Sequence, residues 1–137
     1  MKVKDAMTHE VQLASPHQSI REVAQIMADL DVGALPVGEK DKLVGIITDR
    51  DIAVRAVATG RGPTTRVRDV MSNTVKYCFE DEEIEHISQN IGDMQLHRLP
   101  VVNRDKRLVG IVALADIANV AGPDPAGQAL CGISLPN

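Results

Sequence analysis

Aromatic side chains are almost absent from this chain. Its 137 residues contain one tyrosine, Tyr77, one phenylalanine, Phe79, and no tryptophan. Proteins that bind single-stranded nucleic acid usually stack bases on aromatic side chains, and they also carry a basic face. This chain has instead a formal net charge of −4 and no basic tract. The composition therefore argues against nucleic-acid binding, and it predicts a core built from aliphatic side chains.

Long apolar runs and closely spaced cysteines are missing as well. No stretch approaches the roughly 18 apolar residues of a membrane-spanning helix, and the N-terminal "MKVKDAMTHEV" lacks the apolar region of a signal peptide. We therefore expect a cytoplasmic protein that does not associate with membranes. Cys78 and Cys131 lie far apart in the sequence, so no CxxC redox pair or zinc site is indicated. The simplest expectation for each is a small buried apolar residue, while a disulfide or a redox-responsive role stays open.

Motifs of the common enzyme classes are not found either. The sequence contains no GxSxG, HExxH, P-loop or GxGxxG pattern, and its four histidines show no ligand spacing. We therefore expect neither catalytic activity nor a metal site. The histidines are His9, His17, His86 and His97.

What the chain does contain is an internal repeat. The stretch "VKDAMTHEV" at 3–11 recurs as "VRDVMSNTV" at 67–75, and "LPV" recurs at 35–37 and 99–101, at the same offset of 64. After one extra residue, "LVGI" and "DIA" recur in the same order. Ordered matches of this kind indicate a repeat architecture. We expect one repeat over 1–60, a second over 61–121, and a tail over 122–137 that is either disordered or packed as a short arm.

Each repeat has the same predicted order of elements, β-α-β-β-α. In the first repeat, Ser19 and Glu22 have the spacing of a capping box. The strands "KLVGIIT" and "RLVGIVA" are apolar on both faces, so we expect them to be buried. The last helix is expected to begin at Asp51, or at Asp116 in the second copy, with Gly60 as the first copy's C-cap. The middle helices carry apolar stripes at helical spacing, namely Ile20, Val23, Ala24, Met27 and Leu30, and then Ile84, Ile87, Ile91 and Met94.

The predicted fold class is α/β (α+β). Neither small repeat can bury its apolar helix face alone. We therefore expect the two repeats to pack on each other about a pseudo-two-fold axis, with two related clefts between them.

The ordered set "VKDAM", "LPV" and "LVGIITDRDI", present twice, resembles a CBS domain pair, also called a Bateman module. The resemblance covers residues 3 to about 120. It implies a stand-alone, bacterial-type regulatory module without catalysis that binds AMP, ADP, ATP, NAD or S-adenosylmethionine in the clefts. The regulated partner would be an enzyme or transporter in trans. It also implies a disc-shaped homodimer formed through the helices, with Ile26, Met27, Ile91 and Met94 as candidate contacts.

The stretch "TDRD" at 48–51 lies at a strand-to-helix turn. Thr48 and Asp51 have the spacing of a helix capping box. They also offer what an adenosine phosphate needs, because a fixed carboxylate can accept both ribose hydroxyls and cations or helix N–H groups can bind phosphate. Spacing alone favours capping. The resemblance assigns the ribose to Asp51, with Thr48 beside it and Arg50 as a nearby cation.

The other half of this cleft is assigned by a second resemblance. The stretch "LHRLPVV" at 96–102 is similar to one in the regulatory gamma subunit of the AMP-activated kinase, which implies that His97 and Arg98 face phosphate. Arg98 is the better phosphate ligand because it is always charged and bidentate. The alternative is a solvated pair at a strand end. The resemblance surrounds the adenine with Ile46, Thr74, Val75, Lys76, Leu96 and Pro100.

The second cleft has fewer polar groups. Gly33 and Ala34 stand where the other copy has His97 and Arg98, and Ala113 and Ala115 replace Thr48 and Arg50. Because charge-assisted hydrogen bonds are the stronger ones, we expect asymmetric binding that favours the Asp51 cleft. The weaker cleft is assigned Asp116, Ile111, Val11, Gln12, Ala34 and Pro36. A ligand-free homodimerisation or interaction module is the alternative function.

Overall fold

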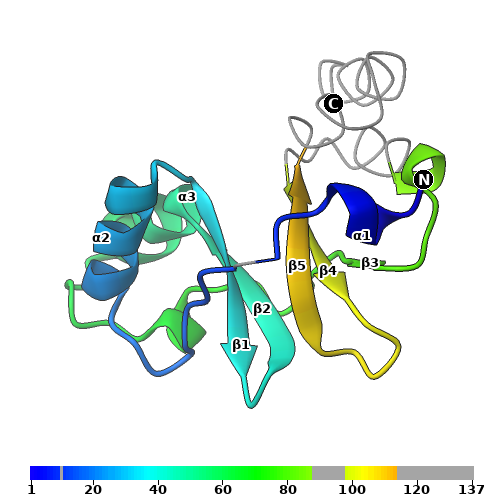
Figure 1. Ribbon diagram of the computed structural model, residues 1–137. Coiled ribbons are helices and arrows are strands. Elements are labelled where there is room, and N and C mark those ends of the chain that lie inside the picture. Colours follow the sequence, from blue (N-terminus) through cyan, green and yellow to red (C-terminus); the bar gives the residue numbers. More distant parts are fainter. Residues whose placement is uncertain (10, 88–97, 114–137) are drawn as a thin grey trace. The chain divides into compact units, whose positions relative to one another are not determined.

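The structure is a computed structural model, and it describes residues 1–9, 11–87 and 98–113. The chain forms two compact units, and each contains residues from both sequence repeats. One unit is Gln12–Val75, and the other combines Met1–Val11 with Lys76–Asn137. Both units contain helices and strands (Figure 1), which confirms the predicted α/β class.

In the unit Gln12–Val75, helix α2 (Ile20–Leu30) precedes a hairpin of β1 (Ala34–Glu39) and β2 (Lys42–Thr48). The strands pair antiparallel, with Ala34 opposite Thr48. The short helix α3 (Asp49–Asp51) continues through a π-helical turn, η1 (Ile52–Ala56), and a 3₁₀ turn, η2 (Val57–Thr59). The predicted first strand is reduced to one parallel bridge between Ala14 and Val37.

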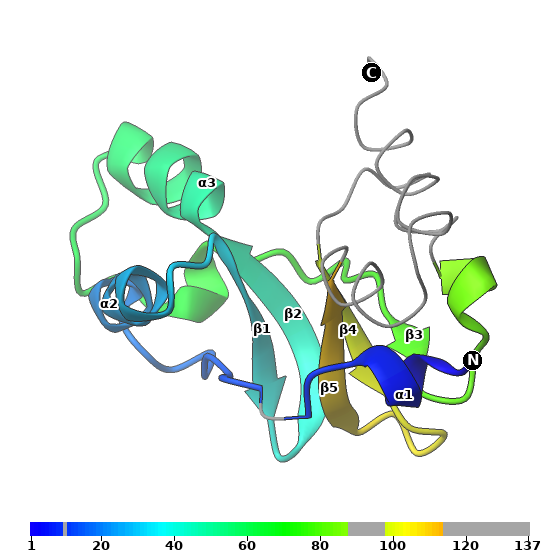
Figure 2. The same ribbon diagram turned by 45° about the horizontal axis from the view of Figure 1, so that its top comes forward.

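The second unit contains α1 (Val3–Ala6) and a three-stranded sheet in the order β3-β4-β5. Strand β3 (Cys78–Phe79) pairs parallel with β4 (Arg98–Val102), and β4 pairs antiparallel with β5 (Leu108–Ala113). The turned view in Figure 2 shows α1 beside this sheet. The element order of the second repeat thus follows the prediction as far as the described residues reach.

The leading segment of each repeat, residues 3–8 in the first and 67–72 in the second, packs on the other repeat. Thr8 and Ile111 exchange backbone hydrogen bonds of 2.8 and 3.0 Å, and Ser72 and Ile46 exchange a pair of 3.0 and 2.9 Å. In the first of these segments Val3, Ala6 and Met7 enter the core around Leu99 and Val112. In the second, η3 (Val67–Asp69) and Val70 belong to the core around Ile47. The compact units therefore do not coincide with the sequence repeats.

Two equivalent glycines make these pairings possible. A Cβ atom added to Gly45 would lie 2.7 Å from the Ser72 carbonyl oxygen and 2.9 Å from the Met71 sulfur. At Gly110 it would lie 2.8 Å from the Thr8 carbonyl oxygen and 2.6 Å from a methionine sulfur. Any side chain there would push the leading segment away, which gives a physical reason for the glycine of the repeated "LVGI".

Helix α2 begins as predicted at Ser19, whose hydroxyl oxygen accepts a 3.2 Å hydrogen bond from the Glu22 backbone N–H. The reciprocal contact differs from a full capping box, because the Glu22 carboxylate accepts from the Ser19 hydroxyl and not from its backbone N–H. Of the predicted apolar stripe, Ile20, Val23 and Met27 are buried, whereas Ala24 and Leu30 are exposed. An amphipathic helix of this length needs only one stripe against the sheet. In the second repeat, Ile84 and Ile87 are buried, and Ile91 and Met94 lie outside the described residues.

Strand β2 is not buried on both faces, which corrects the sequence prediction. Gly45 and Ile47 are buried, whereas Ile46 and Thr48 on the opposite face are only half-buried. Strand β5 has the same alternation. The following helix begins at Asp49 and not at Asp51, and it ends at Gly60, whose φ of 82° confirms the left-handed C-cap.

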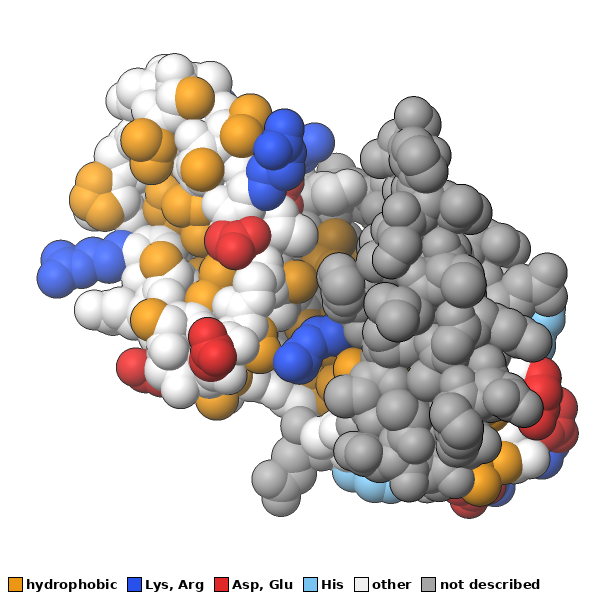
Figure 3. Space-filling view, turned by 90° about the horizontal axis from the view of Figure 1, so that it is seen from above, with side chains coloured by type: hydrophobic (Ala, Val, Ile, Leu, Met, Phe, Trp, Pro, Cys, Tyr) orange, Lys and Arg blue, Asp and Glu red, His pale blue; other side chains and the backbone are white. Residues whose placement is uncertain are grey.

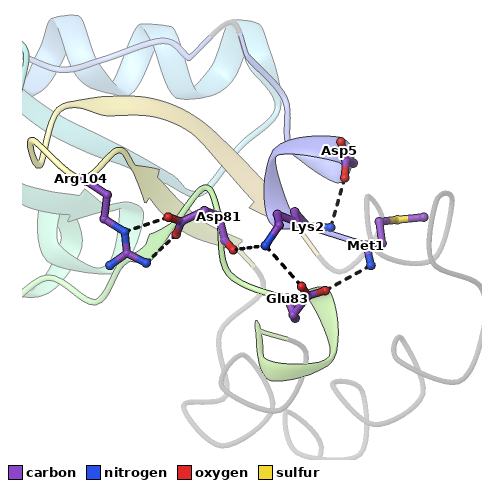
Figure 4. Close-up of polar contacts among 6 residues, drawn as sticks. All are labelled: Met1, Lys2, Asp5, Asp81, Glu83 and Arg104. Carbon is purple, nitrogen blue, oxygen red and sulfur yellow. Dashed lines mark hydrogen bonds and ion pairs between the residues drawn. The ribbon is translucent and has the colours of Figure 1, made fainter.

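In the second unit, the N-terminal segment is tied to the residues after β3 by charged contacts (Figure 4). Lys2 Nζ lies 3.4 Å from Glu83 Oε1 and donates to the Asp81 carbonyl oxygen at 3.1 Å. Arg104 forms two hydrogen bonds with the Asp81 carboxylate, of 2.9 and 2.6 Å, and its guanidinium lies over the Phe79 ring. The hydrogen bonds from Arg104 hold the pKa of Asp81 below its ordinary value. These pairs are exposed, so they orient the segment and contribute little stability.

Cys78 is buried as expected, with 1% of its surface exposed. Burial, with a smaller effect of Glu82, raises the pKa of its thiol to about 12. A thiol that is neither accessible nor ionised is unreactive, so a redox response through Cys78 is disfavoured. Cys131 lies outside the described residues.

Candidate functional site

The strand-to-helix junction at the end of β2 is closed by a reciprocal capping box. The Asp51 backbone N–H donates to Thr48 Oγ1 at 3.0 Å. In return, the Thr48 backbone N–H donates to Asp51 Oδ2, also at 3.0 Å. The capping interpretation of "TDRD" is therefore correct, and it fixes one oxygen of a carboxylate whose side chain is only 15% exposed.

Capping does not use up the acceptor capacity of Asp51. An ionised carboxylate offers about four acceptor positions on two oxygens, and the box occupies one position on Oδ2. The other oxygen, Oδ1, faces Arg55 Nε at 3.8 Å, an ion-pair distance that is too long for a hydrogen bond. Capping and ligand binding can therefore involve different oxygens of the same side chain.

Sequence reasoning missed Arg55. Its Nη1 donates to the carbonyl oxygens of Met71 at 3.3 Å and Val70 at 3.5 Å. The available signal was its position four residues after Asp51 in a predicted helix, which is the spacing of a side-chain ion pair. The equivalent residue of the second repeat, at the offset of 65, is Val120.

The connector, defined here as residues 72–75, runs beside the same junction. Its first residue, Ser72, is paired with Ile46 through two backbone hydrogen bonds, and the Ser72 hydroxyl donates to the Thr74 carbonyl oxygen at 3.3 Å. Thr74 is exposed and Val75 is half-buried. The unit Gln12–Val75 thus contains six of the residues predicted for the Asp51 cleft: Ile46, Thr48, Arg50, Asp51, Thr74 and Val75.

Asp49 and Arg50 shape the edge of the junction. The Asp49 backbone N–H donates to the Gly33 carbonyl oxygen at 2.9 Å, and a Cβ atom on Gly33 would lie 3.1 Å from Asp49 Oδ2. Gly33 therefore leaves room for a carboxylate at the position where the second repeat has His97. Arg50 is exposed, and its backbone N–H donates to Asp49 Oδ1 at 2.8 Å.

The remaining predicted residues belong to several elements. In the second unit, Arg98 begins β4 and is exposed, Pro100 is buried, and Lys76 is exposed. Of the second-cleft residues, Ile111, Val11 and Ala34 are half-buried, Gln12 is exposed and Pro36 is buried. His97, Leu96 and Asp116 lie outside the described residues. The ligand roles assigned to all of these residues stay predictions.

Metal ligands and membrane spans can be assessed over the described residues, 1–9, 11–87 and 98–113. Within them, no three histidine, cysteine, aspartate or glutamate side chains gather as metal ligands would. The helices there are also too short or too polar to cross a membrane.

The chain is a tandem pair of α/β repeats. Each repeat packs against the leading segment of the other, so the two form a paired module. The family model of the CBS domain matches residues 3–57 and 67–122. The chain therefore belongs to the CBS domain family, as its resemblance indicated.

Similar proteins cover nearly the whole chain. The CBS domain-containing protein YhcV of Bacillus subtilis is 45% identical over 136 residues, which are 98% of this chain and 96% of that protein. The solved structure of hypoxic response protein I with two coordinated zinc ions is 34% identical, with a TM-score of 0.77, and the match covers 87% and 98% of the two chains. The CBS domain pair of protein MJ0100, solved with 5′-methylthioadenosine and S-adenosyl-L-methionine, is 32% identical, with a TM-score of 0.75 and coverage of 89% and 96%.

Proposed function

We propose that this chain is a regulatory module without catalytic activity that binds an adenosine-containing ligand at Asp51. The observation that carries the proposal is the geometry of the Asp51 carboxylate, which is fixed through Oδ2 by the capping box and keeps Oδ1 for other partners. The CBS domain pair of MJ0100, solved in complex with 5′-methylthioadenosine and S-adenosyl-L-methionine, supports the ligand class. Within that class, the resemblance favours AMP, ADP, ATP or NAD.

The ligand parts are assigned as follows. The ribose diol donates to Asp51, because a fixed carboxylate can accept from both hydroxyls. The adenine lies against the half-buried face of β2 that carries Ile46, with Thr74 and Val75 beside it. Such a mixed site, with an apolar wall and one fixed polar anchor, is typical of small-molecule pockets. The bound state would signal to an enzyme or transporter in trans.

A thermal-stability screen tests the ligand class. AMP, ADP, ATP, NAD, adenosine, 5′-methylthioadenosine and S-adenosylmethionine are each added to the purified chain. A ligand at 100 times its dissociation constant adds about 2.7 kcal/mol to the free energy of unfolding, so at least one compound should raise the melting temperature. No shift with any of them would refute the proposal.

Two variants of Asp51 separate capping from binding. Asp51→Asn keeps an oxygen that can accept from the Thr48 N–H, but it replaces the other acceptor by an amide donor. We expect this variant to melt near the wild-type temperature without ligand and to lose the ligand-induced shift. Asp29→Ala, at an exposed position of α2, is the matched control and should keep the shift. An intact shift in Asp51→Asn would show that the site lies elsewhere.

The predicted phosphate role of Arg98 needs a separate measurement. A bidentate cation should matter only to ligands that carry phosphate. Arg98→Ala is therefore expected to weaken AMP or ATP at least tenfold while it changes adenosine binding little, as measured by titration calorimetry. Equal losses for nucleotide and nucleoside would refute the phosphate assignment.

Homodimerisation without a ligand is the second candidate, and exposed apolar side chains on the helices favour it. Figure 3 shows several hydrophobic side chains at the surface of the unit Gln12–Val75. Three apolar side chains of this unit are exposed, with Leu30 at 50%, Val54 at 47% and Val57 at 67%. Met27, a predicted contact, is instead part of the core. Light scattering should report a dimer that Val57→Glu dissociates. A clean dimer with no ligand-induced shift would favour this function.

A further inference from the structure

Arg55 joins two parts of the candidate site that are separate in the sequence. Its Nε lies 3.8 Å from Asp51 Oδ1, and its Nη1 donates to the backbone carbonyl oxygens of Val70 and Met71. The guanidinium is planar and holds its donors in a fixed fork. Its contacts to the carbonyl groups therefore restrict where its Nε can lie relative to the carboxylate.

The first consequence concerns the orientation of the Asp51 carboxylate. The Thr48 N–H holds only Oδ2, so the rotation of the carboxylate about that contact depends on what Oδ1 faces. Among the described residues, Arg55 is the cation within ion-pair distance of Oδ1. A binding group that is already oriented loses less conformational entropy when the ligand arrives.

The second consequence concerns the connector, residues 72–75. Met71 directly precedes Ser72, whose backbone pairs with Ile46. The contacts from Arg55 thus hold the chain immediately before the connector, next to the strand that provides the proposed adenine wall. In the second repeat, the equivalent position in the sequence is Val120, and valine has no side-chain hydrogen-bond donor.

We propose that Arg55 is a positioning residue of the adenosine site, which orients the Asp51 carboxylate toward the ribose diol and holds the connector beside β2. This inference rests on the proposed function, because it concerns the same ligand. It adds Arg55 to the residues of the Asp51 site. It also extends the difference between the two copies, because the second copy has Val120 at the equivalent position.

The test measures how much more tightly the protein binds a ligand with the ribose diol than a ligand without it. Dissociation constants of adenosine, 2′,3′-dideoxyadenosine and AMP are determined by titration calorimetry for the wild type, Arg55→Met, Arg55→Lys and Arg61→Met. Arg61 is the matched control, because its Nη1 donates to the carbonyl oxygen of Asp69 at 3.5 Å but it has no ion pair with Asp51.

In the wild type, adenosine should bind more tightly than the dideoxy compound. Because exposed ion pairs are modest, Arg55→Met should lower this preference about threefold, and it should weaken adenosine and AMP by the same factor. Arg55→Lys should lie between, and Arg61→Met should match the wild type. A merely structural role would weaken all three ligands equally and leave the preference unchanged.

Each contrary result has a distinct meaning. An unchanged preference in Arg55→Met overturns the positioning role, and so does a much greater loss for AMP than for adenosine, which would make Arg55 a phosphate ligand. If Arg55→Met does not fold, Arg55→Lys is judged by the same two criteria. A wild-type protein that binds none of the three compounds, or binds adenosine without a preference for the diol, refutes the proposed site at Asp51 and this inference with it.

Discussion

Replacing Gly45 by alanine tests how the leading segment of the second repeat is held on the first. The new Cβ atom would lie 2.7 Å from the Ser72 carbonyl oxygen, a backbone atom, and 2.9 Å from the Met71 sulfur. Both distances are below those that real Cβ atoms show. The methionine side chain can rotate away, but the Ser72 backbone must move.

The size of the effect follows from two contributions. Overpacking in a close-packed region costs about 1–3 kcal/mol. If Ser72 moves far enough to break its pair with Ile46, each of the two hydrogen bonds adds about 0.5–1.5 kcal/mol. We therefore expect Gly45→Ala to lower the free energy of unfolding by about 2–6 kcal/mol if both hydrogen bonds break. This loss is large compared with the about 5–15 kcal/mol of a typical domain.

Urea denaturation followed by circular dichroism measures the effect. Gly62→Ala is the matched control in the same unit, because nothing lies within 4 Å of its added Cβ atom. It should be neutral or slightly stabilising, since alanine restricts the unfolded chain. If Gly45→Ala unfolds at the same urea concentration as the control, the close approach of Ser72 to β2 does not depend on Gly45. That result would refute the role assigned to this glycine.

Three further predictions concern single sites. The pKa of the Cys78 thiol is raised to about 12 from an ordinary 9.0, so the thiol ionises at lower pH in the unfolded chain than in the folded one. The free energy of unfolding should therefore fall between about pH 9 and 12, and it should fall less in Cys78→Ala. Arg104→Met should return the lowered pKa of Asp81 toward its ordinary value in an NMR titration. The variant should also lack the stabilisation that the wild type loses as the pH falls through the lowered pKa. An unchanged pKa of Asp81 would contradict the pairing with Arg104. Lys40 and Asp41, with φ of 54° and 66° between β1 and β2, occupy a two-residue turn that favours Asn-Gly. The double variant Lys40→Asn, Asp41→Gly relieves left-handed strain of about 1–2 kcal/mol at Asp41 against an entropic cost of about 0.5–1 kcal/mol for the new glycine. It should therefore raise the free energy of unfolding by about 0.5–1 kcal/mol in urea denaturation.

Local patterns predicted the elements well and their packing less well. The start of α2 at Ser19 and the C-cap at Gly60 follow from short-range hydrogen bonding and backbone geometry, which a few neighbouring residues determine. The exposure of Leu30 and the half-buried face of β2 could not be predicted in this way, because burial depends on which elements cover each face. Periodicity indicates only which side chains share a face.

The candidate site shows the same division. Thr48 and Asp51 were found from their spacing and from the family resemblance. Arg55 was not, because its significance lies in contacts with Val70 and Met71, fifteen and more residues away. Cys78 illustrates the opposite case, since its expected burial required no knowledge of its neighbours.

The sequence by itself determined the repeat, the family, the difference between "TDRD" and "ALAD", and most of the order of elements within the described residues. These properties are written in local motifs and in their recurrence along the chain. Only the tertiary structure decided that Val3–Met7 completes the core of the second repeat and Val67–Val70 that of the first. It also decided that the Asp51 carboxylate caps its helix through one oxygen and faces Arg55 with the other. The first result depends on contacts between residues distant in sequence. In the second, the Thr48 and Arg55 contacts of Asp51 are local, but the Val70 and Met71 carbonyl groups that hold Arg55 are fifteen and sixteen residues away from it. Such long-range contacts exist only after the chain has folded.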